Sequence, residues 1–344
     1  MQDNTQLSDI RSGWQMVIWL CYDTKTDYGI SEDNMEYTDF VSLHTVTEIK
    51  RALERCGHHV EYIGNVYRLK ERLEKEQPIV DLVFNIAEGF GSRNREALIP
   101  SLLEIYDIPC TASDTYAMAL NLNKHHTKIL AHSIGVPVPK GVCFRAVTSD
   151  VLKQVSEIGY PIVLKLNAEG GSMGVTLIHD DESLIRESNK LIDQYHEELL
   201  AEEYVPGKEI TVPIIGNREK AKALGVVLLR HEDGRDITIY DCHMKGAEND
   251  ITNSLDTGLS KELVEMICDY SLSIHRFFDL RDYSRMDFRV SPNGQPYFLE
   301  INTMPSLGRD GSFELCAKAA GSSYHEMIGE IVAAAEARCH LQGY

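Results

Sequence analysis

Short apolar runs alternate with amphipathic stretches over the first third of the chain. Their lengths and spacing predict strands and helices in alternation, at 14–21, 41–56, 59–63, 66–76 and 79–86. Such alternation is typical of a parallel sheet covered by helices. The pattern therefore predicts an α/β fold, in which ligands would lie at the carboxyl ends of the strands.

A second group of apolar runs follows residues 135–139, whose glycine and two prolines are expected to end a helix and link it to a new unit. Strands and one charged helix are expected at 160–166, 175–178, 181–195, 198–205 and 210–215. The loop 167–174 contains three glycines and a serine, so its amides could surround phosphate oxygens while Lys165 supplies a positive charge. The alternative is a plain glycine hairpin.

The C-terminal third combines strands, a polar stretch and helices. Two strands are expected within 221–242, around a turn at 232–235. The polar stretch that follows, up to Gly258, is predicted to be a functional lid. Helices are expected at 261–277 and about 313–341.

Two alternating segments flank Asn293-Gly294, a strong signal for a β-hairpin. A two-residue turn there would pair Asp287 with Glu300 and Arg285 with Asn302. One face of the hairpin would carry polar side chains, namely Arg285, Asp287, Arg289, Glu300 and Asn302. The other face would be apolar and suited to burial, with Met286, Phe288, Val290, Leu299 and Ile301.

The polar face of this hairpin indicates a metal site. Asp287, Glu300 and Asn302 offer two carboxylates and an amide oxygen with no Cys or His among them. Such ligands fit a hard divalent cation such as Mg²⁺, which usually shares them with phosphate. The alternative is a solvated hairpin in which the same residues only form ion pairs with arginine.

Two further segments carry candidate side chains. The loop from Glu88 to Glu96 follows a predicted strand, and its Arg93 and Arg95 could bind a substrate carboxylate through paired hydrogen bonds. The alternative is a solvated connection into a helix at 97–106. Lys124 and Lys128 lie one helical turn apart and face the same way, which alone would indicate only surface lysines.

Composition narrows the class of protein. The chain has 344 residues, enough for two or three domains. Its net charge of -19 argues against a nucleic-acid partner or an anionic membrane surface. No apolar run is long enough to span a bilayer, and residues 1–13 are expected to be a disordered tail without a signal peptide. The eight cysteines stand singly, which favours reduced thiols and a cytoplasmic location.

The order of these motifs over about residues 14–340 resembles the ATP-grasp superfamily, and within it the D-alanine–D-alanine ligase family. The resemblance implies a Rossmann-like parallel-sheet domain at 14–118. A two-part α+β ATP-grasp fold would follow, with a central subdomain at 119–209 and a catalytic subdomain at 210–344. It also implies a homodimer.

Roles follow from the resemblance residue by residue. Lys124 and Lys165 would hold ATP phosphates under a flap formed by Glu169, Gly170, Gly171, Ser172, Met173 and Gly174. The adenine would be lined by Glu202, Glu203, Tyr204 and Val205, and the ribose by Glu209. Asp287, Glu300 and Asn302 would bind two Mg²⁺ ions, for which Mn²⁺ could substitute. Lys245 would approach the γ-phosphate, and Arg285 would stabilise the oxyanion of a tetrahedral intermediate.

The sequence departs from the family where substrates would bind. Glu88-Gly89 stands where the family usually has His-Gly, Gly171 replaces a serine, Gly246 replaces a tyrosine, and Ser306-Leu307-Gly308 follows Pro305 in place of an immediate glycine. Residues 22–25 also lack the family's glycine-rich opening. We therefore expect substrate contacts from Glu88, Arg93, Arg95, Ser306 and Gly308.

These departures shape the expected function. We expect an ATP-dependent ligase that joins a small carboxylate to an amine through an acyl phosphate, with substrates other than two D-alanines. The alternatives are an authentic D-alanine–D-alanine ligase and a nucleotide-binding regulatory module that has lost turnover.

Overall fold

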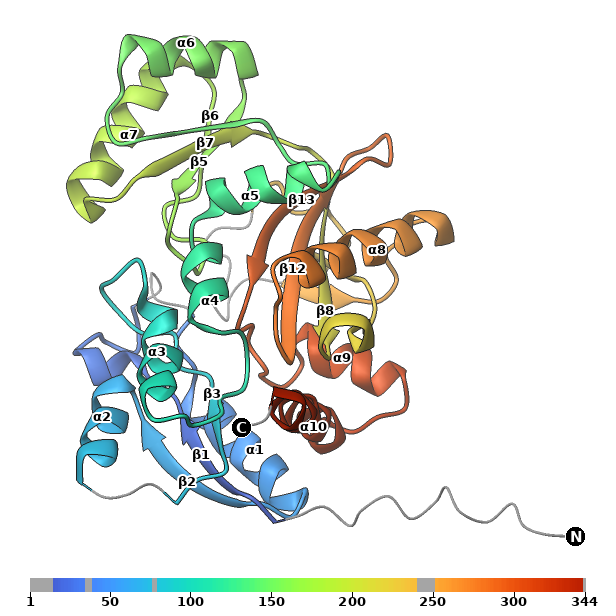
Figure 1. Ribbon diagram of the computed structural model, residues 1–344. Coiled ribbons are helices and arrows are strands. Elements are labelled where there is room, and N and C mark those ends of the chain that lie inside the picture. Colours follow the sequence, from blue (N-terminus) through green and yellow to red (C-terminus); the bar gives the residue numbers. More distant parts are fainter. Residues whose placement is uncertain (1–14, 35–38, 76–78, 240–250, 343–344) are drawn as a thin grey trace, which may run out of the picture.

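Three sheets with their covering helices make up the protein in a computed structural model that describes residues 15–34, 39–75, 79–239 and 251–342 (Figure 1). The first sheet has the order β2-β1-β3 and is parallel, as predicted. Its strands are β1 (Val17–Cys21), β2 (His59–Gly64) and β3 (Leu82–Asn85). The predicted tail and Lys245 lie outside the described residues.

Side chains alternate between the two faces of the first sheet. On β1, Ile18 and Leu20 point to one apolar core, and Trp19 and Cys21 point to another. The helices that cover these faces are α1 (Leu43–Arg55), α2 (Val66–Lys75) and α3 (Leu98–Ile105), with short 3-10 turns η1 (Lys25–Tyr28) and η2 (Arg95–Ala97). Both faces are therefore buried, as in other parallel sheets.

The second sheet is antiparallel, with the order β4-β7-β5-β6. It consists of β4 (Gly141–Phe144), β5 (Ile162–Leu166), β6 (Thr176–Ile178) and β7 (Leu199–Glu203), and its apolar face is covered by α6 (Ser149–Ile158) and α7 (Asp181–Tyr195). Neither β4 nor α6 was predicted from the sequence pattern. The loop between β5 and β6 is the predicted glycine-rich connection.

The third sheet has the order β11-β10-β8-β12-β13, with β9 beside β8. Its strands are β8 (Lys208–Ile215), β9 (Lys222–Ala223), β10 (Val227–His231), β11 (Ile251–Ser254), β12 (Tyr283–Val290) and β13 (Pro296–Asn302). Around it lie α4 (Thr115–Asn121), α5 (Lys124–Ser133), η3 (Arg218–Lys220), α8 (Lys261–Phe277), α9 (Ser312–Ala319) and α10 (Tyr324–Gln342).

One sequence-based expectation for the third sheet is wrong over the described residues. The strand expected directly after the turn at 232–235 is only an isolated bridge between Arg230 and Asp236. Of the stretch predicted to be a lid, residues 240–250 lie outside the described residues, and β11, which follows them, pairs with β10 as the edge of the sheet. The role of this stretch as a lid stays a prediction.

The last helix packs on the first domain. On α10, Ile328, Ile331 and Val332 share one core with Val46 and Ile49 of α1, and Figure 1 shows the two helices side by side. Each of the first two sheets lies within one predicted domain, and β8 begins just before residue 210. The domain boundaries themselves stay a prediction.

The hairpin register agrees with the prediction from Arg285 to Asp287 and is shifted by one residue for Phe288, Arg289 and Val290. Arg285 pairs with Asn302 and Asp287 with Glu300, as expected, but Phe288 pairs with Phe298. The turn is one residue longer than predicted, because Ser291 bonds to Gln295, and a bulge at Leu299 restores the register. The bulge turns Leu299 out of the apolar core, so its expected burial is wrong.

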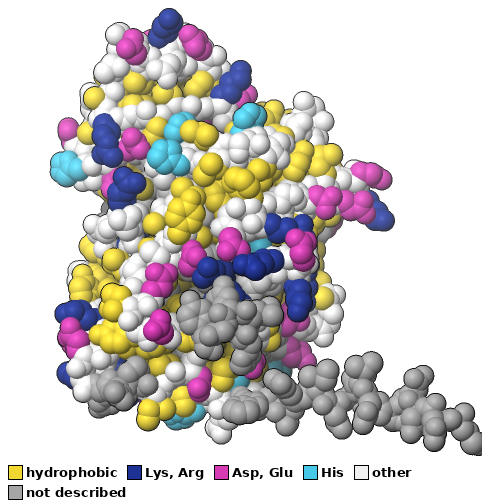
Figure 2. Space-filling model, in the orientation of Figure 1, with side chains coloured by type: hydrophobic (Ala, Val, Ile, Leu, Met, Phe, Trp, Pro, Cys, Tyr) yellow, Lys and Arg dark blue, Asp and Glu magenta, His cyan; other side chains and the backbone are white. Residues whose placement is uncertain are grey.

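The surface mixes both signs of charge. On the face drawn in Figure 2, Lys and Arg side chains stand among Asp and Glu side chains rather than in one extended basic region. Among the described residues, no helix combines the length and the apolar character needed to cross a membrane.

Candidate active site

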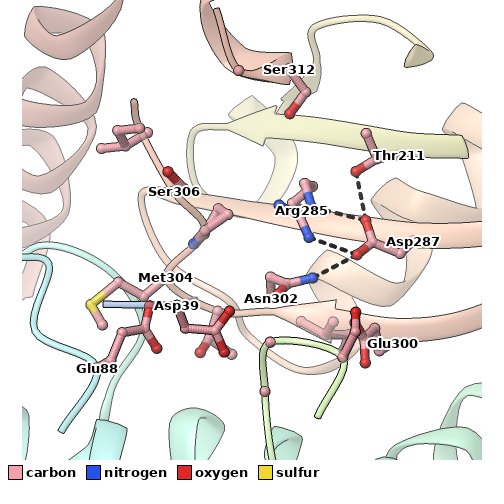
Figure 3. A pocket seen from close by; sticks show the side chains of 18 of the residues that line it. Asp39, Glu88, Thr211, Arg285, Asp287, Glu300, Asn302, Met304, Ser306 and Ser312 are labelled. Carbon is pink, nitrogen blue, oxygen red and sulfur yellow. Dashed lines mark hydrogen bonds and ion pairs between the residues drawn. The ribbon is translucent and has the colours of Figure 1, made fainter. Parts of the chain in front are cut away.

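A cavity of about 500 Å³ opens where the three sheets meet. Its walls come from the β12–β13 hairpin, the glycine loop, the loop after β3 and the start of α1 (Figure 3). A smaller cavity of about 100 Å³ lies between the second sheet and the hairpin, and Lys124, Gly170, Glu209 and Glu300 line both cavities. The two spaces therefore adjoin.

Asp287 lies at the centre of a hydrogen-bond network in the larger cavity. Arg285 binds both of its oxygens, from Nε to Oδ1 at 2.9 Å and from Nη2 to Oδ2 at 2.8 Å. Thr211 donates to Oδ1 at 2.6 Å, and Asn302 donates to Oδ2 at 2.9 Å (Figure 3). Thr211 lies directly opposite Asp287 because β8 pairs with β12.

Glu300 is held ionised by lysines. Lys124 Nζ lies 3.2 Å from Glu300 Oε2 and donates to the carbonyl oxygen of Glu169 at 2.7 Å. Burial raises the pKa of Glu300, but Lys124 and Lys165 outweigh it and lower the pKa well below its usual range. Lys124 therefore ties the hairpin to the glycine loop.

A cluster of two lysines and one glutamate lies under the smaller cavity. Lys128 binds Oε2 of Glu202 and Lys165 binds Oε1, and all three residues are buried. Lys165 and Glu202 line the smaller cavity together with Glu203, Tyr204 and Val205. The segment predicted to bind the adenine thus lies beside the lysine predicted to bind phosphate.

Arg289 closes the far side of the smaller cavity. It donates to the carbonyl oxygens of Val205 and Thr238, each at 3.1 Å, and pairs with Glu209 at 2.9 Å. Burial raises the pKa of Glu209, and the Arg289 guanidinium opposes that rise. The guanidinium also lies 5.9 Å from the ring centroid of Tyr204, so Arg289 holds several cavity residues in place.

The opposite end of the larger cavity is acidic. Asp39, Glu88 and Glu96 line it, with Asp39 and Glu88 beside Met304 in Figure 3. Burial, and then the charges of Glu96, Asp39 and Asp23, raise the pKa of Glu88. Among the described residues, the Glu88 carboxylate has no hydrogen-bond partner, so it is available to a bound molecule.

Asp23 fixes the turn that carries Glu88. It is fully buried and accepts hydrogen bonds from the backbone amides of Glu88 at 3.0 Å and Gly89 at 2.8 Å, and from the Tyr28 hydroxyl at 3.0 Å. Gly89 has φ 72°, and a Cβ there would lie 2.6 Å from the carbonyl oxygen of Arg95. The position of Glu88 is therefore tightly defined.

The two candidate arginines behave differently. Arg95 is buried, donates to the carbonyl oxygen of Ala168 at 3.0 Å and pairs with Glu169 at 3.4 Å. It thus holds the base of the glycine loop. Arg93 is exposed and lines neither cavity.

The remaining predicted residues differ in which cavity they line. Gly170 and Ser172 line both cavities, Gly171 and Ser306 line the larger one, and Glu169 and Met173 line the smaller one. Gly308 lines neither, although its amide donates to Ser306 Oγ at 3.3 Å. Gly174 also lines neither and packs near Leu166 and Leu191.

Sequence reasoning missed four residues of this site. Three of them are Asp23, Asp39 and Thr211. The fourth is Arg289, which was placed on the hairpin but not recognised as the partner of Glu209. Asp23 and Asp39 stand in segments without a recognisable motif, so no local signal marked them. Thr211 is on a predicted strand, but only the pairing of β8 with β12 brings it to Asp287.

The donor set fits a hard divalent cation. Within the part of the chain that the structure describes, Oδ1 of Asn302 accepts no hydrogen bond, so it and Glu300 offer oxygen ligands next to Asp287 on the paired strand. Both Asp287 oxygens already accept hydrogen bonds, so a cation there would compete with Arg285 and Thr211.

Comparison with known proteins identifies the family. The family described as "D-ala D-ala ligase C-terminus" matches residues 130–333. The D-alanine–D-alanine ligase of Aquifex aeolicus is 32% identical over 293 residues, which cover 85% of this chain and 94% of that protein. The uncharacterized protein y4sG of Sinorhizobium fredii is 29% identical over 293 residues, covering 83% and 86%.

The fold is shared with solved structures. The D-alanine–D-alanine ligase of Bacillus anthracis, complexed with ATP, matches with a TM-score of 0.75 at 21% identity, covering 95% of this chain and 100% of that one. The predicted combination of an α/β domain with an ATP-grasp fold is thereby confirmed. The chain belongs to the D-alanine–D-alanine ligase family, whose members are ATP-grasp enzymes that form carbon–nitrogen bonds.

Proposed function

We propose that this chain joins a small carboxylate to an amine at the expense of ATP, through an acyl phosphate, with release of ADP and phosphate. One arrangement carries the proposal. Arg285, Asp287 and Glu300 on the hairpin face Lys124 and the glycine loop across a single cavity. Positive charge beside a carboxylate pair suits phosphoryl transfer, which depends on positioning and charge stabilisation.

The smaller cavity is the proposed nucleotide site. Lys124 and Lys165 would contact phosphates beneath the loop 169–174. The segment 202–205 would line the adenine, and Glu209 would accept hydrogen bonds from the ribose. Support comes from the geometry, because these residues come from α5, β5, β7, β8 and the loop between β5 and β6, and meet in one space.

The proposed metal ligands are Asp287, Glu300 and Asn302, holding Mg²⁺ or, as a substitute, Mn²⁺. When bound, such cations offset the charge of phosphate oxygens. Arg285 would then be free of Asp287 to stabilise an oxyanion. Lys245, proposed to act on the γ-phosphate, lies outside the described residues.

The proposed substrates are not two D-alanines. Glu88 replaces the family's usual histidine, and Asp39 and Glu96 add negative charge at the same end of the cavity. Ser306 would contact substrate from the other side, whereas Arg95 would act by holding the glycine loop. Direct contacts from Arg93 and Gly308 would require these residues to approach the cavity, which they do not line.

A specific observation favours the alternative of an authentic D-alanine–D-alanine ligase. Relatives that cover most of the chain carry that name, including the one from Aquifex aeolicus. We also propose a cytoplasmic homodimer that acts on small molecules, without a nucleic-acid or membrane partner.

Measurement of phosphate release separates these functions. The protein is incubated with Mg-ATP and a panel of amino acids and amines, alone and in pairs, and products are identified by mass spectrometry. Release with a pair other than two D-alanines supports the proposal, and a D-alanine dipeptide as the main product supports the alternative. ATP binding without release across the whole panel would contradict both.

A further inference from the structure

Lys128 makes a buried contact that the proposed site does not use. Its exposed fraction is 4%, and its ammonium binds the Glu202 carboxylate, which is 3% exposed. Lys128 lies on α5 one turn after Lys124, yet among the described residues it lines neither cavity. Burial of a charged group raises the free energy of the folded state, so the position of Lys128 behind Glu202 needs a physical explanation.

Glu202 divides its two oxygens between two lysines. Oε2 binds Lys128 and Oε1 binds Lys165. Glu202 of β7 lies opposite Val163 of β5, so Lys165, two residues along, points from the same face of the sheet. The apolar residues Leu164 and Ala201 fill the other face. Lys165, unlike Lys128, reaches the smaller cavity.

The cluster carries one positive charge in excess. Lys165 and Glu202 alone would form a neutral pair, and the carboxylate would hold the ammonium away from any other anion. With Lys128 on the second oxygen, Glu202 is shared, and the ammonium of Lys165 keeps part of its charge for the cavity. Burial lowers the pKa of Lys128 to about 7, and Lys165 adds to this fall whereas Glu202 opposes it.

We infer that Lys128 is a positioning residue for nucleotide phosphate. Because Lys128 binds one oxygen of Glu202, this carboxylate does not fully neutralise Lys165. The ammonium of Lys165 therefore stays oriented toward the cavity with part of its charge available. The inference rests on the proposed function, since it takes the ligand of the smaller cavity to be a nucleotide. It predicts an effect on phosphate affinity from a residue that touches no ligand.

Binding of ATP and of adenosine by calorimetry tests this inference. Lys128→Met should weaken ATP binding about tenfold, which is the effect of losing one charge-assisted contact. The affinity for adenosine should change less than about twofold. Lys128→Arg should retain the wild-type ratio of the two affinities. Lys222→Met serves as the matched control, because it removes an exposed lysine that pairs with Glu330 far from both cavities.

A second variant covers the case in which Lys128→Met does not fold. Lys128→Gln can still donate a hydrogen bond to Glu202 but adds no charge, so it should weaken ATP binding relative to adenosine binding in the same direction as Lys128→Met. Equal weakening of ATP and adenosine in Lys128→Met, or no weakening of either, would overturn the inference. So would a wild-type ratio of the two affinities in Lys128→Gln. Failure of the wild type to bind ATP would instead contradict the proposed function.

Discussion

Arg285 and Asp287 bind each other through two parallel hydrogen bonds, although they are only two positions apart on β12. Alternate residues of a strand share a face, so both side chains line the larger cavity. The guanidinium of Arg285 therefore binds the same carboxylate that we propose as a metal ligand. Catalysis as proposed requires this pair to separate.

Asp287→Asn tests that arrangement. The amide keeps the size of the side chain but removes the charge that a cation would need, so phosphate release should fall by about 100-fold or more. Adenosine binding should be unchanged, because Asp287 lines the larger cavity and not the smaller one that contains the adenine segment. Asp193→Asn on the exposed side of α7 is the control. Undiminished phosphate release would remove Asp287 from the metal site and favour a regulatory role.

Glu88→Gln tests the acidic end of the cavity. If the carboxylate faces a positive group of the substrate, its removal should raise the KM for that substrate by about tenfold, the effect of one charge-assisted hydrogen bond. The KM for ATP should not change. Steady-state kinetics with each substrate varied in turn measures both values, and Glu71→Gln on the surface of α2 is the control. An equal rise in both KM values would argue against a substrate contact.

Arg95→Met tests the tether of the glycine loop. Loss of the contacts with Ala168 and Glu169 should loosen the loop, weaken ATP about tenfold and speed proteolysis within 167–174. Limited proteolysis with and without ATP follows the second effect. Arg186→Met on α7 should leave both measurements at wild-type values. A protease pattern identical to wild type would show that the loop does not depend on this tether.

The environment of Asp23 predicts that the free energy of unfolding depends on pH. Burial raises the pKa of Asp23 to about 6, although hydrogen bonds from Gly89, Tyr28 and Glu88 oppose the rise. An acid with a raised pKa in the folded state stabilises the fold when protonated, and that stability is lost as the pH rises through the folded-state pKa. The wild type should therefore gain about 1 kcal/mol over Asp23→Asn between about pH 7.5 and about pH 5.

Denaturant unfolding at both pH values measures this difference in free energy. Because Asn does not titrate, other groups cancel when the two proteins are compared. A difference that stays flat over this range would show that Asp23 keeps an ordinary pKa.

Local sequence signals predicted much of the site. The helices at 181–195 and 261–277 and the three β12–β13 pairs from Arg285 to Asp287 agree with the structure. The register was right because the longer turn and the bulge at Leu299 offset each other. That bulge has no local sequence signal, so Leu299 was misplaced.

Contacts between distant segments could not be predicted in this way. Lys128 and Glu202 are 74 positions apart, and their contact depends on how α5 crosses the second sheet. The same holds for Asp39, whose carboxylate lies against the glycine loop so closely that a Cβ on Gly170 would come within 2.2 Å of it. Spacing and residue type carry no information on such packing.

The placement of α10 on α1 has a consequence for biosynthesis. A chain growing on the ribosome makes its first sheet early, but the partner for one side of that layer, residues 324–342, emerges hundreds of codons later. Until then Val46 and Ile49 have no permanent cover from that helix. A chain that terminates before α10 would therefore expose part of this apolar core and be prone to aggregation. It would not fold into a shorter active protein.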